Sequence, residues 1–323
     1  MIVQWFACVA FFSTLWLLPT VVSAQDRSPV AEPTASTNSA TWEALTARTP
    51  WVFLGDSNTY AGGYVAQLEA RLRTASPQLK LLNLGVSSET ASGLSEVDHP
   101  FKRPCVHERL DKVLLMTQPG VVFACYGMND GIYDPPNAER LAAYKLGMQQ
   151  LAEKIHAFGA TLIVLTPPIF EPEPVAAKGN FGPTEAGRYA YFAPYQRYDD
   201  VLGQQAEWCL TNELQAAAVI DIRSLLKSAK QQRLTTDPTF AFSKDGVHFG
   251  DVAHELVAQQ ILTALQAPAD LIADQPSPDE IAAATRRTQL LRDAYLSASG
   301  KNRPGLPAGL PVWLAEKLAQ QIK

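Results

Sequence analysis

The sequence contains few cysteines and none of the usual cysteine frameworks. Only 4 of its 323 residues are cysteine, and Cys8 lies in the apolar N-terminal stretch. The other three, Cys105, Cys125 and Cys209, lack the close CxxC spacing of a zinc site or a disulfide scaffold. At most one bridge can form among them. Cys105 and Cys209 are the pair to test, because Cys125 lies inside an apolar run.

The chain also lacks basic blocks and, beyond its N-terminus, long apolar runs. It has 27 Lys and Arg against 32 Asp and Glu, a formal net charge of −5, and no segment is rich in Lys or Arg. The basic footprint of a nucleic-acid-binding protein is therefore missing. No later apolar run is long enough to span a bilayer. We expect no nucleic-acid partner and no stable membrane span, and the oligomeric state is left open.

Several common catalytic motifs are absent as well. The sequence has no GxSxG nucleophile elbow and no phosphate-binding GxGxxG or GxxxxGK[ST] loop. His254 and Glu255 begin like the zinc-protease motif HExxH, but Ala258 stands where the second histidine would be. We therefore predict no metal site.

The N-terminal residues predict export. Residues 1–24 combine a short apolar core with Val22-Ser23-Ala24, a small-residue exit typical of signal-peptidase cleavage. We expect a signal peptide over 1–24 and a periplasmic or extracellular protein. A signal anchor is the alternative, because no Lys or Arg precedes the apolar run. Residues 25–48 are rich in Ser, Thr, Ala and Pro, which is typical of a flexible linker, so no core is expected there.

Residues 49–267 alternate between short apolar runs and longer stretches of helical spacing. The runs are WVFLG, KLLNLG, GVVFACYG, ATLIVLTPP and AAVIDI, and the helical spacing is clearest over 137–158 and 251–266. Continuous apolar strands are typical of a sheet covered on both faces. The pattern predicts an α/β fold, a doubly wound, mostly parallel five-stranded sheet with helices on both faces. The ligand site of such a sheet lies beyond the carboxyl ends of its strands.

Residues 268–323 predict a helical C-terminal extension. Ser277 as N-cap, Pro278 in the first turn and Gly300 as terminator delimit one helix. A second, short amphipathic segment runs from 312 to 322. We expect this extension to pack on the preceding domain rather than to form a second catalytic unit.

Four groups of small polar residues and glycines lie at the predicted strand ends or before the last helix of the domain, at 55–59, 83–85, 127–130 and 245–248. A serine hydrolase needs a hydroxyl, a base, a carboxylate that orients the base, and donors for an oxyanion. Ser57, His248 and Asp245 supply the first three. The amides of Ser57 and Gly85 and the side-chain amide of Asn129 are the candidate donors.

These groups resemble the four blocks of the SGNH hydrolase superfamily, also called GDSL-type esterases and lipases, in residue type and order. The resemblance covers about residues 50–266. It implies that Ser57 is the nucleophile, His248 the base and Asp245 its partner. It also implies that Gly85 and Asn129 complete the oxyanion hole with the Ser57 amide, and that no cofactor is needed.

The chain departs from the family pattern in two places. Ser88 stands where the family often has a second glycine after the second block, and Phe249 follows the catalytic histidine where proline is common. Neither change removes a catalytic group, so they affect the shape of the pocket. Each group alone also fits a plain turn or a helix cap. Asp56 and Asp130 are expected to shape such turns rather than to transfer protons.

The segment over 166–198 is the main clue to the substrate. It follows the fourth strand and carries seven aromatic residues, Phe170, Phe181, Tyr189, Tyr191, Phe192, Tyr195 and Tyr198. Such rings suit stacking on sugars, although they could equally anchor a long loop. The candidate substrate-binding residues are Asp56, Asn58, Tyr133, Phe181, Tyr191 and Phe249.

From these features and the family's use on O-acetylated carbohydrates we expect an exported serine esterase that removes short-chain esters, acetyl above all, from a carbohydrate. One alternative is a lysophospholipase or thioesterase, which would need an apolar tunnel for a long acyl chain. The other is a catalytically silent glycan-binding protein of the same fold.

Overall fold

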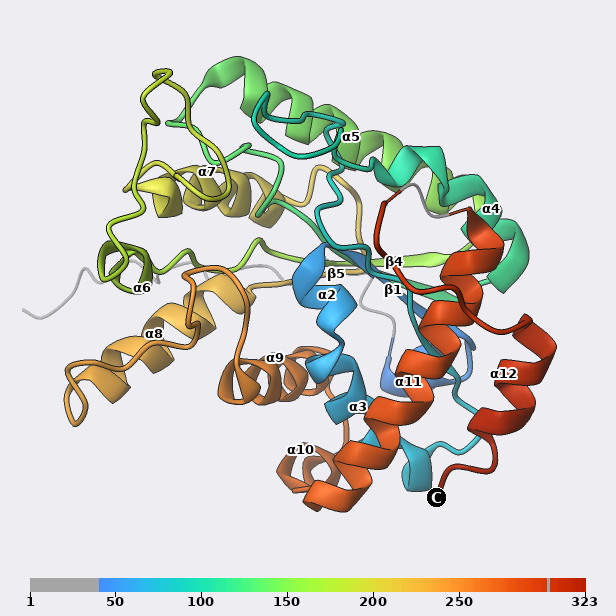
Figure 1. The fold of residues 1–323 in the computed structure, drawn as a ribbon. Helices are drawn as coiled ribbons and strands as arrows, with labels where there is room; N and C mark the ends of the chain where they lie inside the picture. The colour runs from blue at the N-terminus through green and yellow to red at the C-terminus, as the bar shows by residue number, and fades with distance from the viewer. Residues whose placement is uncertain (1–40, 301–302) are drawn as a thin grey trace, which may run out of the picture. The chain divides into compact units, whose positions relative to one another are not determined.

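The computed structural model describes residues 41–300 and 303–323, which are built around one parallel sheet (Figure 1). Its strands are β1 (Trp51–Gly55), β2 (Leu81–Asn83), β3 (Val121–Cys125), β4 (Thr161–Leu165) and β5 (Ala218–Ile220), in the order β2-β1-β3-β4-β5. Every neighbouring pair is parallel, and each strand lies within one of the five apolar runs. The predicted doubly wound α/β fold is confirmed.

Helices connect the strands and continue beyond the last one. They are α1 (Trp42–Thr46), α2 (Ser57–Ala61), α3 (Gly63–Ala75), the 3₁₀ helix η1 (Val106–Glu108), α4 (Leu110–Thr117), α5 (Ala138–Phe158), α6 (Pro172–Ala176), α7 (Tyr198–Leu210), α8 (Ile222–Leu234), α9 (Asp251–Ala264), α10 (Ala269–Ala273), α11 (Pro278–Ser299) and α12 (Val312–Ala319).

Both faces of the sheet are buried, because successive strand residues point to opposite sides. Val52 and Leu54 of β1 pack in one apolar cluster with residues of α4, α5, α7 and α11. Trp51 and Phe53 pack in a second cluster with residues of α1, α3, α8 and α9. Figure 1 shows α5 and α7 on one side of the sheet and α8 and α9 on the other. This double cover explains why the strands are apolar throughout.

The predicted linker over 25–48 is wrong in its last part. Residues 42–46 form α1, in which Trp42 and Leu45 are buried. Trp42 meets Trp51 edge to face, and the Trp51 indole Nε1 donates to the Leu45 carbonyl at 3.0 Å. The segment as a whole is rich in Ser, Thr, Ala and Pro, so its composition did not indicate this short apolar helix. Residues 25–40 of the predicted linker and the predicted signal peptide lie outside the described residues.

The C-terminal extension covers the edge of the sheet. Helix α11 begins at a capping box formed by Ser277 and Glu280 and ends at Gly300, as its sequence predicts. It lies against α3 and the edge strand β2. Covering an edge strand removes a row of unpaired backbone groups that would otherwise invite aggregation.

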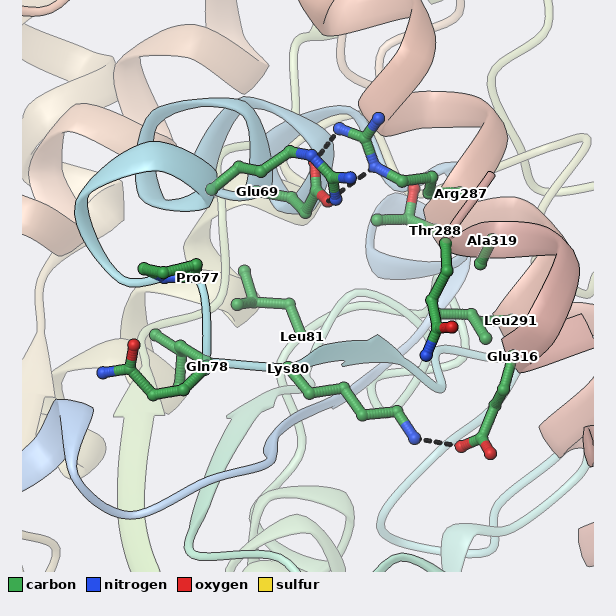
Figure 2. Close-up of a pocket in the computed structure, with 13 residues that line it drawn as sticks. Glu69, Pro77, Gln78, Lys80, Leu81, Arg287, Thr288, Leu291, Glu316 and Ala319 are labelled. Carbon is green, nitrogen blue, oxygen red and sulfur yellow. Dashed lines mark hydrogen bonds and ion pairs between the residues drawn. The ribbon is translucent and has the colours of Figure 1, made fainter. Parts of the chain in front are cut away.

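Ion pairs fasten this extension to the domain, as Figure 2 shows. Arg287 of α11 forms a two-point pair with Glu69 of α3 at 2.5 and 2.7 Å, and Glu316 of α12 pairs with Lys80 beside β2. These residues surround a cavity of about 370 Å³. Its lining includes none of the predicted catalytic residues.

Two smaller questions from the sequence concern the cysteines and the membrane. Cys105, Cys125 and Cys209 are all free thiols, so Cys105 and Cys209 are not bonded to each other. The Cys209 thiol instead lies 3.3 Å from the Tyr144 hydroxyl. None of the helices in the described ranges has both the length and the apolar character needed to cross a membrane.

Candidate active site

The turn after β1 places Ser57 at the carboxyl edge of the sheet. Strand β1 ends at Gly55, the Asp56 carboxylate caps α2 by accepting from the Asn58 amide at 3.0 Å, and Ser57 is the first residue of that helix. A Cβ on Gly55 would lie 2.7 Å from the Cys125 carbonyl oxygen, so only glycine fits against β3 here. The Gly-Asp-Ser sequence is therefore a tight strand-to-helix turn that carries a hydroxyl.

A chain of hydrogen bonds joins Ser57, His248 and Asp245. The Ser57 Oγ lies 2.9 Å from the His248 Nε2, and the His248 Nδ1 lies 2.7 Å from the Asp245 Oδ2. The other carboxylate oxygen, Oδ1, accepts from the backbone amides of Val247 and His248 and from the Ser243 hydroxyl. With all these donors directed at it, the Asp245 carboxylate is fixed in place and in turn orients the imidazole.

The same contacts set the protonation of the pair. Burial opposes ionisation of Asp245, but hydrogen bonds from the His248 side chain and backbone outweigh it and hold the pKa of the carboxyl well below its usual range. The hydrogen bond to Asp245 raises the pKa of His248, against the effect of burial. A carboxylate beside a basic imidazole is the arrangement needed to remove a proton from a hydroxyl.

Two buried side chains hold the histidine loop in place, one from the nucleophile helix and one from the segment before α6. Asn58 donates through Nδ2 to the Val247 carbonyl at 3.0 Å and accepts from the Phe249 amide at 2.9 Å. Glu171, which is almost fully buried, accepts from the backbone amides of residues 242 and 243. Asn58 thus acts on the loop and not on a substrate. Glu171 was not predicted, and its only sequence signal is an acid within the Pro-rich segment.

The structure does not bring Gly85 into this group. Its amide donates to the Asn83 Oδ1 at 3.0 Å, and Gly85 is not among the residues that line the cavity beside Ser57. A Cβ there would lie 2.5 Å from the backbone nitrogen of Tyr60. Gly85 is therefore required for close packing against α2, and the amide predicted as an oxyanion donor is already used.

Ser88 occupies the place that was expected for Gly85. It lines the cavity with Ser57, and its amide has no hydrogen-bond partner among the described residues. Its φ of 68° lies in the left-handed region, which favours glycine. This backbone conformation explains why the family often has a glycine here. The serine in place of that glycine was the sequence signal that could have identified Ser88 as a residue of the site.

Asn129 approaches the same cavity from the end of β3. Its side-chain Nδ2 donates to the Glu89 carbonyl at 3.1 Å, and its Oδ1 accepts from the Tyr133 hydroxyl at 3.2 Å. An amide nitrogen carries two hydrogens, so one remains for a ligand in the cavity. The two contacts fix the direction in which that hydrogen points.

The cavity beside Ser57 has a volume of about 280 Å³. It is lined by Ser57, Ser87, Ser88, His99, Pro100, Phe101, Arg103, Asn129, Tyr133, Tyr191, His248 and Arg303. A second cavity, of about 540 Å³, also borders the histidine and is lined by residues 240–242, 244–245 and 248–252. His248 and its partner Asp245 border this second space.

The other predicted substrate-binding residues separate into four sets. Tyr133 and Tyr191 line the cavity with Ser57, whereas Phe249 lines the second cavity. Phe181 packs against a buried aromatic cluster that contains Phe170 and Tyr198, so these rings anchor their segment. Asp56 is buried beneath the nucleophile, and burial raises its pKa to about 7 although the Asn58 amide opposes this.

No cluster of three or more metal-ligating side chains occurs among residues 41–300 and 303–323. The candidate site brings together a hydroxyl, an imidazole, a carboxylate and nearby amide donors.

Comparison with known proteins gives a family and a fold. The model of the GDSL-like lipase/acylhydrolase family matches residues 53–256, whereas no curated protein matches the chain. Among solved structures, BT4096, a gut microbial diltiazem-metabolizing enzyme, has a TM-score of 0.52 at 17% identity over 67% of this chain and 46% of that one. The chain thus spans less than half the length of BT4096.

Two acetylxylan esterases are also similar. A catalytic variant of Axe2 from Geobacillus stearothermophilus gives a TM-score of 0.47 at 19% identity, covering 70% of this chain and 97% of that one. The acetyl xylan esterase AlAXEase gives 0.48 at 18% identity, covering 67% and 99%. At these identities the likeness concerns the fold alone. The family match covers most of the sheet, including Ser57, Asn129, Asp245 and His248, and the chain therefore belongs to the GDSL-like lipase/acylhydrolase family as a carboxylic ester hydrolase.

Proposed function

We propose that this protein is an exported serine esterase that removes short-chain esters, acetyl above all, from a carbohydrate through an acyl-enzyme on Ser57. The observation that carries the chemistry is the continuous hydrogen-bond chain from the Ser57 hydroxyl through His248 to Asp245, with bonds of 2.9 and 2.7 Å. Export rests on the apolar N-terminus and its small-residue exit.

In the proposed mechanism the Ser57 Oγ attacks the ester carbonyl while the His248 Nε2 takes its proton. The negative oxygen of the tetrahedral intermediate accepts hydrogen bonds from the amides of Ser57 and Ser88 and from the Asn129 Nδ2. Collapse of the intermediate expels the alcohol, which takes the proton from His248, and leaves the acyl group on Ser57. Water then attacks this ester while His248 accepts a proton from it. The bond between the acyl carbon and the Ser57 Oγ breaks, His248 returns the proton to this oxygen, and the acid leaves. Asp245 keeps the imidazole in the correct tautomer throughout.

The cavity beside Ser57 is called the catalytic cavity from here on. Its lining supports a short acyl group on a polar alcohol. At about 280 Å³ the cavity lies at the lower end of the range for small-molecule sites, roughly 300–1,000 Å³. Three serines, two histidines, two arginines and an asparagine line it. Such a lining suits a hydroxyl-rich sugar, and Phe101 and Tyr191 supply ring faces or edges for its apolar side.

Covalent labelling tests the chemistry separately from the substrate. A fluorophosphonate probe should label the folded mature protein at Ser57, and the Ser57→Ala variant should not be labelled. The reaction should also fail in His248→Ala, which keeps the hydroxyl but has no base. An unlabelled wild-type protein would favour the silent binding protein of this fold.

The second cavity gives a reason to test the lipid alternative as well. Phe240, Phe242, Phe249 and Val252 lie around its space of about 540 Å³, as a longer acyl chain would need. Rates on 4-nitrophenyl esters from acetate to palmitate, beside acetate release from an acetylated polysaccharide, separate the two substrates. Our proposal requires a steep fall with chain length. A preference for the long-chain ester would overturn the carbohydrate assignment and leave the Ser57 chemistry intact.

A further inference from the structure

Arg303, a residue of the C-terminal extension, lines the catalytic cavity. It lies after α11, in the C-terminal extension, yet it lines the same cavity as Ser57 and His248. Its guanidinium carbon lies 5.3 Å from the centre of the Phe101 ring, which also lines the cavity. The extension therefore contributes a cation to the catalytic cavity.

Arg303 has no ion-pair partner within residues 41–300 and 303–323. No carboxylate of the residues that the structure describes forms an ion pair with it, and no Asp or Glu is among those that line the cavity. Its Nη1 donates to the carbonyl of Pro304 at 2.8 Å, and its buried Nε has no hydrogen-bond partner. The other arginine of the cavity, Arg103, differs because it is locked in a two-point pair with Glu96 at 2.5 and 2.6 Å.

The surroundings of Arg303 are aromatic. His99 meets both Phe101 and Tyr191 edge to face, with ring centres 4.5 and 5.3 Å apart. Asp98, next to His99, pairs with Arg188 at 2.7 and 2.9 Å, so the two loops that form this wall are tied together. The result is an aromatic wall beside a guanidinium that has no carboxylate partner among the described residues.

We propose that Arg303 binds a carboxylate of the substrate, so that the preferred substrates are acetylated sugars that carry a carboxyl group, such as uronates. Guanidinium groups bind carboxylates through two parallel hydrogen bonds, and an unpaired one in a cavity without acids is placed for this task. The aromatic wall would contact the ring of the same sugar. This inference rests on the proposed carbohydrate-ester activity and names its substrate class.

A matched pair of substrates tests it. We would compare kcat/KM for a methyl O-acetyl-glucuronide with that for the corresponding methyl O-acetyl-glucoside, in which a CH₂OH group replaces the carboxylate. Wild-type protein should prefer the uronate by about tenfold, the value of one charge-assisted hydrogen bond at a partly open site. The preference should shrink as ionic strength rises, because salt screens exposed charges.

Variants show whether Arg303 is responsible. Arg303→Gln should abolish the preference, mainly through KM for the uronate, and Arg303→Lys should keep part of it. Lys102→Gln removes an exposed cation on the same loop as Phe101 that does not line the cavity, and it should keep the full preference. Because the readout is a ratio of two substrates, it does not depend on the fraction of folded enzyme.

The outcomes separate this inference from the function beneath it. Failure to hydrolyse 4-nitrophenyl acetate would overturn the proposed function. Hydrolysis of that ester but of neither sugar ester would overturn the carbohydrate assignment, and this inference with it. Hydrolysis of both sugars without a preference, or a preference that persists in Arg303→Gln, would overturn the role of Arg303 alone.

Discussion

Replacing Asn129 by Ala tests the oxyanion site most directly. The side chain is buried beside the catalytic cavity, with Nδ2 bonded to the Glu89 carbonyl and Oδ1 bonded to the Tyr133 hydroxyl. These two contacts leave one amide hydrogen for the substrate. Alanine removes that donor without touching Ser57, His248 or Asp245.

The structure predicts two separate effects of this substitution. Loss of one oxyanion donor should lower kcat by about 10²- to 10³-fold, equivalent to about 2.7–4 kcal/mol in the activation free energy. The change should also leave the Glu89 carbonyl and the Tyr133 hydroxyl without a partner. An unsatisfied buried group costs about 1–3 kcal/mol, so the two together should lower the free energy of unfolding by about 2–6 kcal/mol.

The assay is steady-state hydrolysis of 4-nitrophenyl acetate, with the active fraction counted by fluorophosphonate labelling. Tyr133→Phe is the matched control, because it removes the bond to the Asn129 Oδ1 and keeps the amide donor. We expect it to lower kcat by less than about tenfold. A value of kcat for Asn129→Ala within threefold of wild type would refute the donor role. Equal losses of kcat in the two variants would show that activity depends on the ordering of the Asn129 side chain by Tyr133 and not on its amide donor.

Three further outcomes follow from groups around the same site. Because the pKa of His248 is raised above 6.5 and the base must be neutral, kcat/KM should fall on acidification through one ionisation centred above pH 6.5; a midpoint below 6 would contradict its role. Burial lowers the pKa of His254 to about 4, so its contribution to stability is present above pH 6.5 and lost as pH falls through 4, about 3 kcal/mol in all. Chemical unfolding of the wild-type protein should show this dependence of stability on pH. The His254→Gln variant should lack it. Ser88→Gly should keep activity and raise the free energy of unfolding by about 1 kcal/mol, since glycine adopts a φ of 68° without strain; a loss of stability would show that the serine side chain is needed.

The local features of this protein could be predicted from its sequence, because they depend on neighbours along the chain. The apolar runs specify the five strands, and Ser277 and Gly300 mark the two ends of α11. Parallel strands bring their carboxyl ends to one edge of the sheet, so the groups at 55–59, 83–85, 127–130 and 245–248 were expected to meet there. The structure brings Ser57, Asn129 and His248 to one cavity.

Other features depend on contacts between distant segments, which no local pattern encodes. Gly85 and Ser88 lie three residues apart, and only the packing of Gly85 against α2 and the direction of each amide decide which one faces the cavity. In the same way, Glu171 holds a loop more than 70 residues away, and Arg303 reaches a cavity whose nucleophile lies in the first helix after β1. A periodic sequence determines which residues are buried on an element, whereas the tertiary structure decides which of them share a cavity, because that depends on how the elements pack.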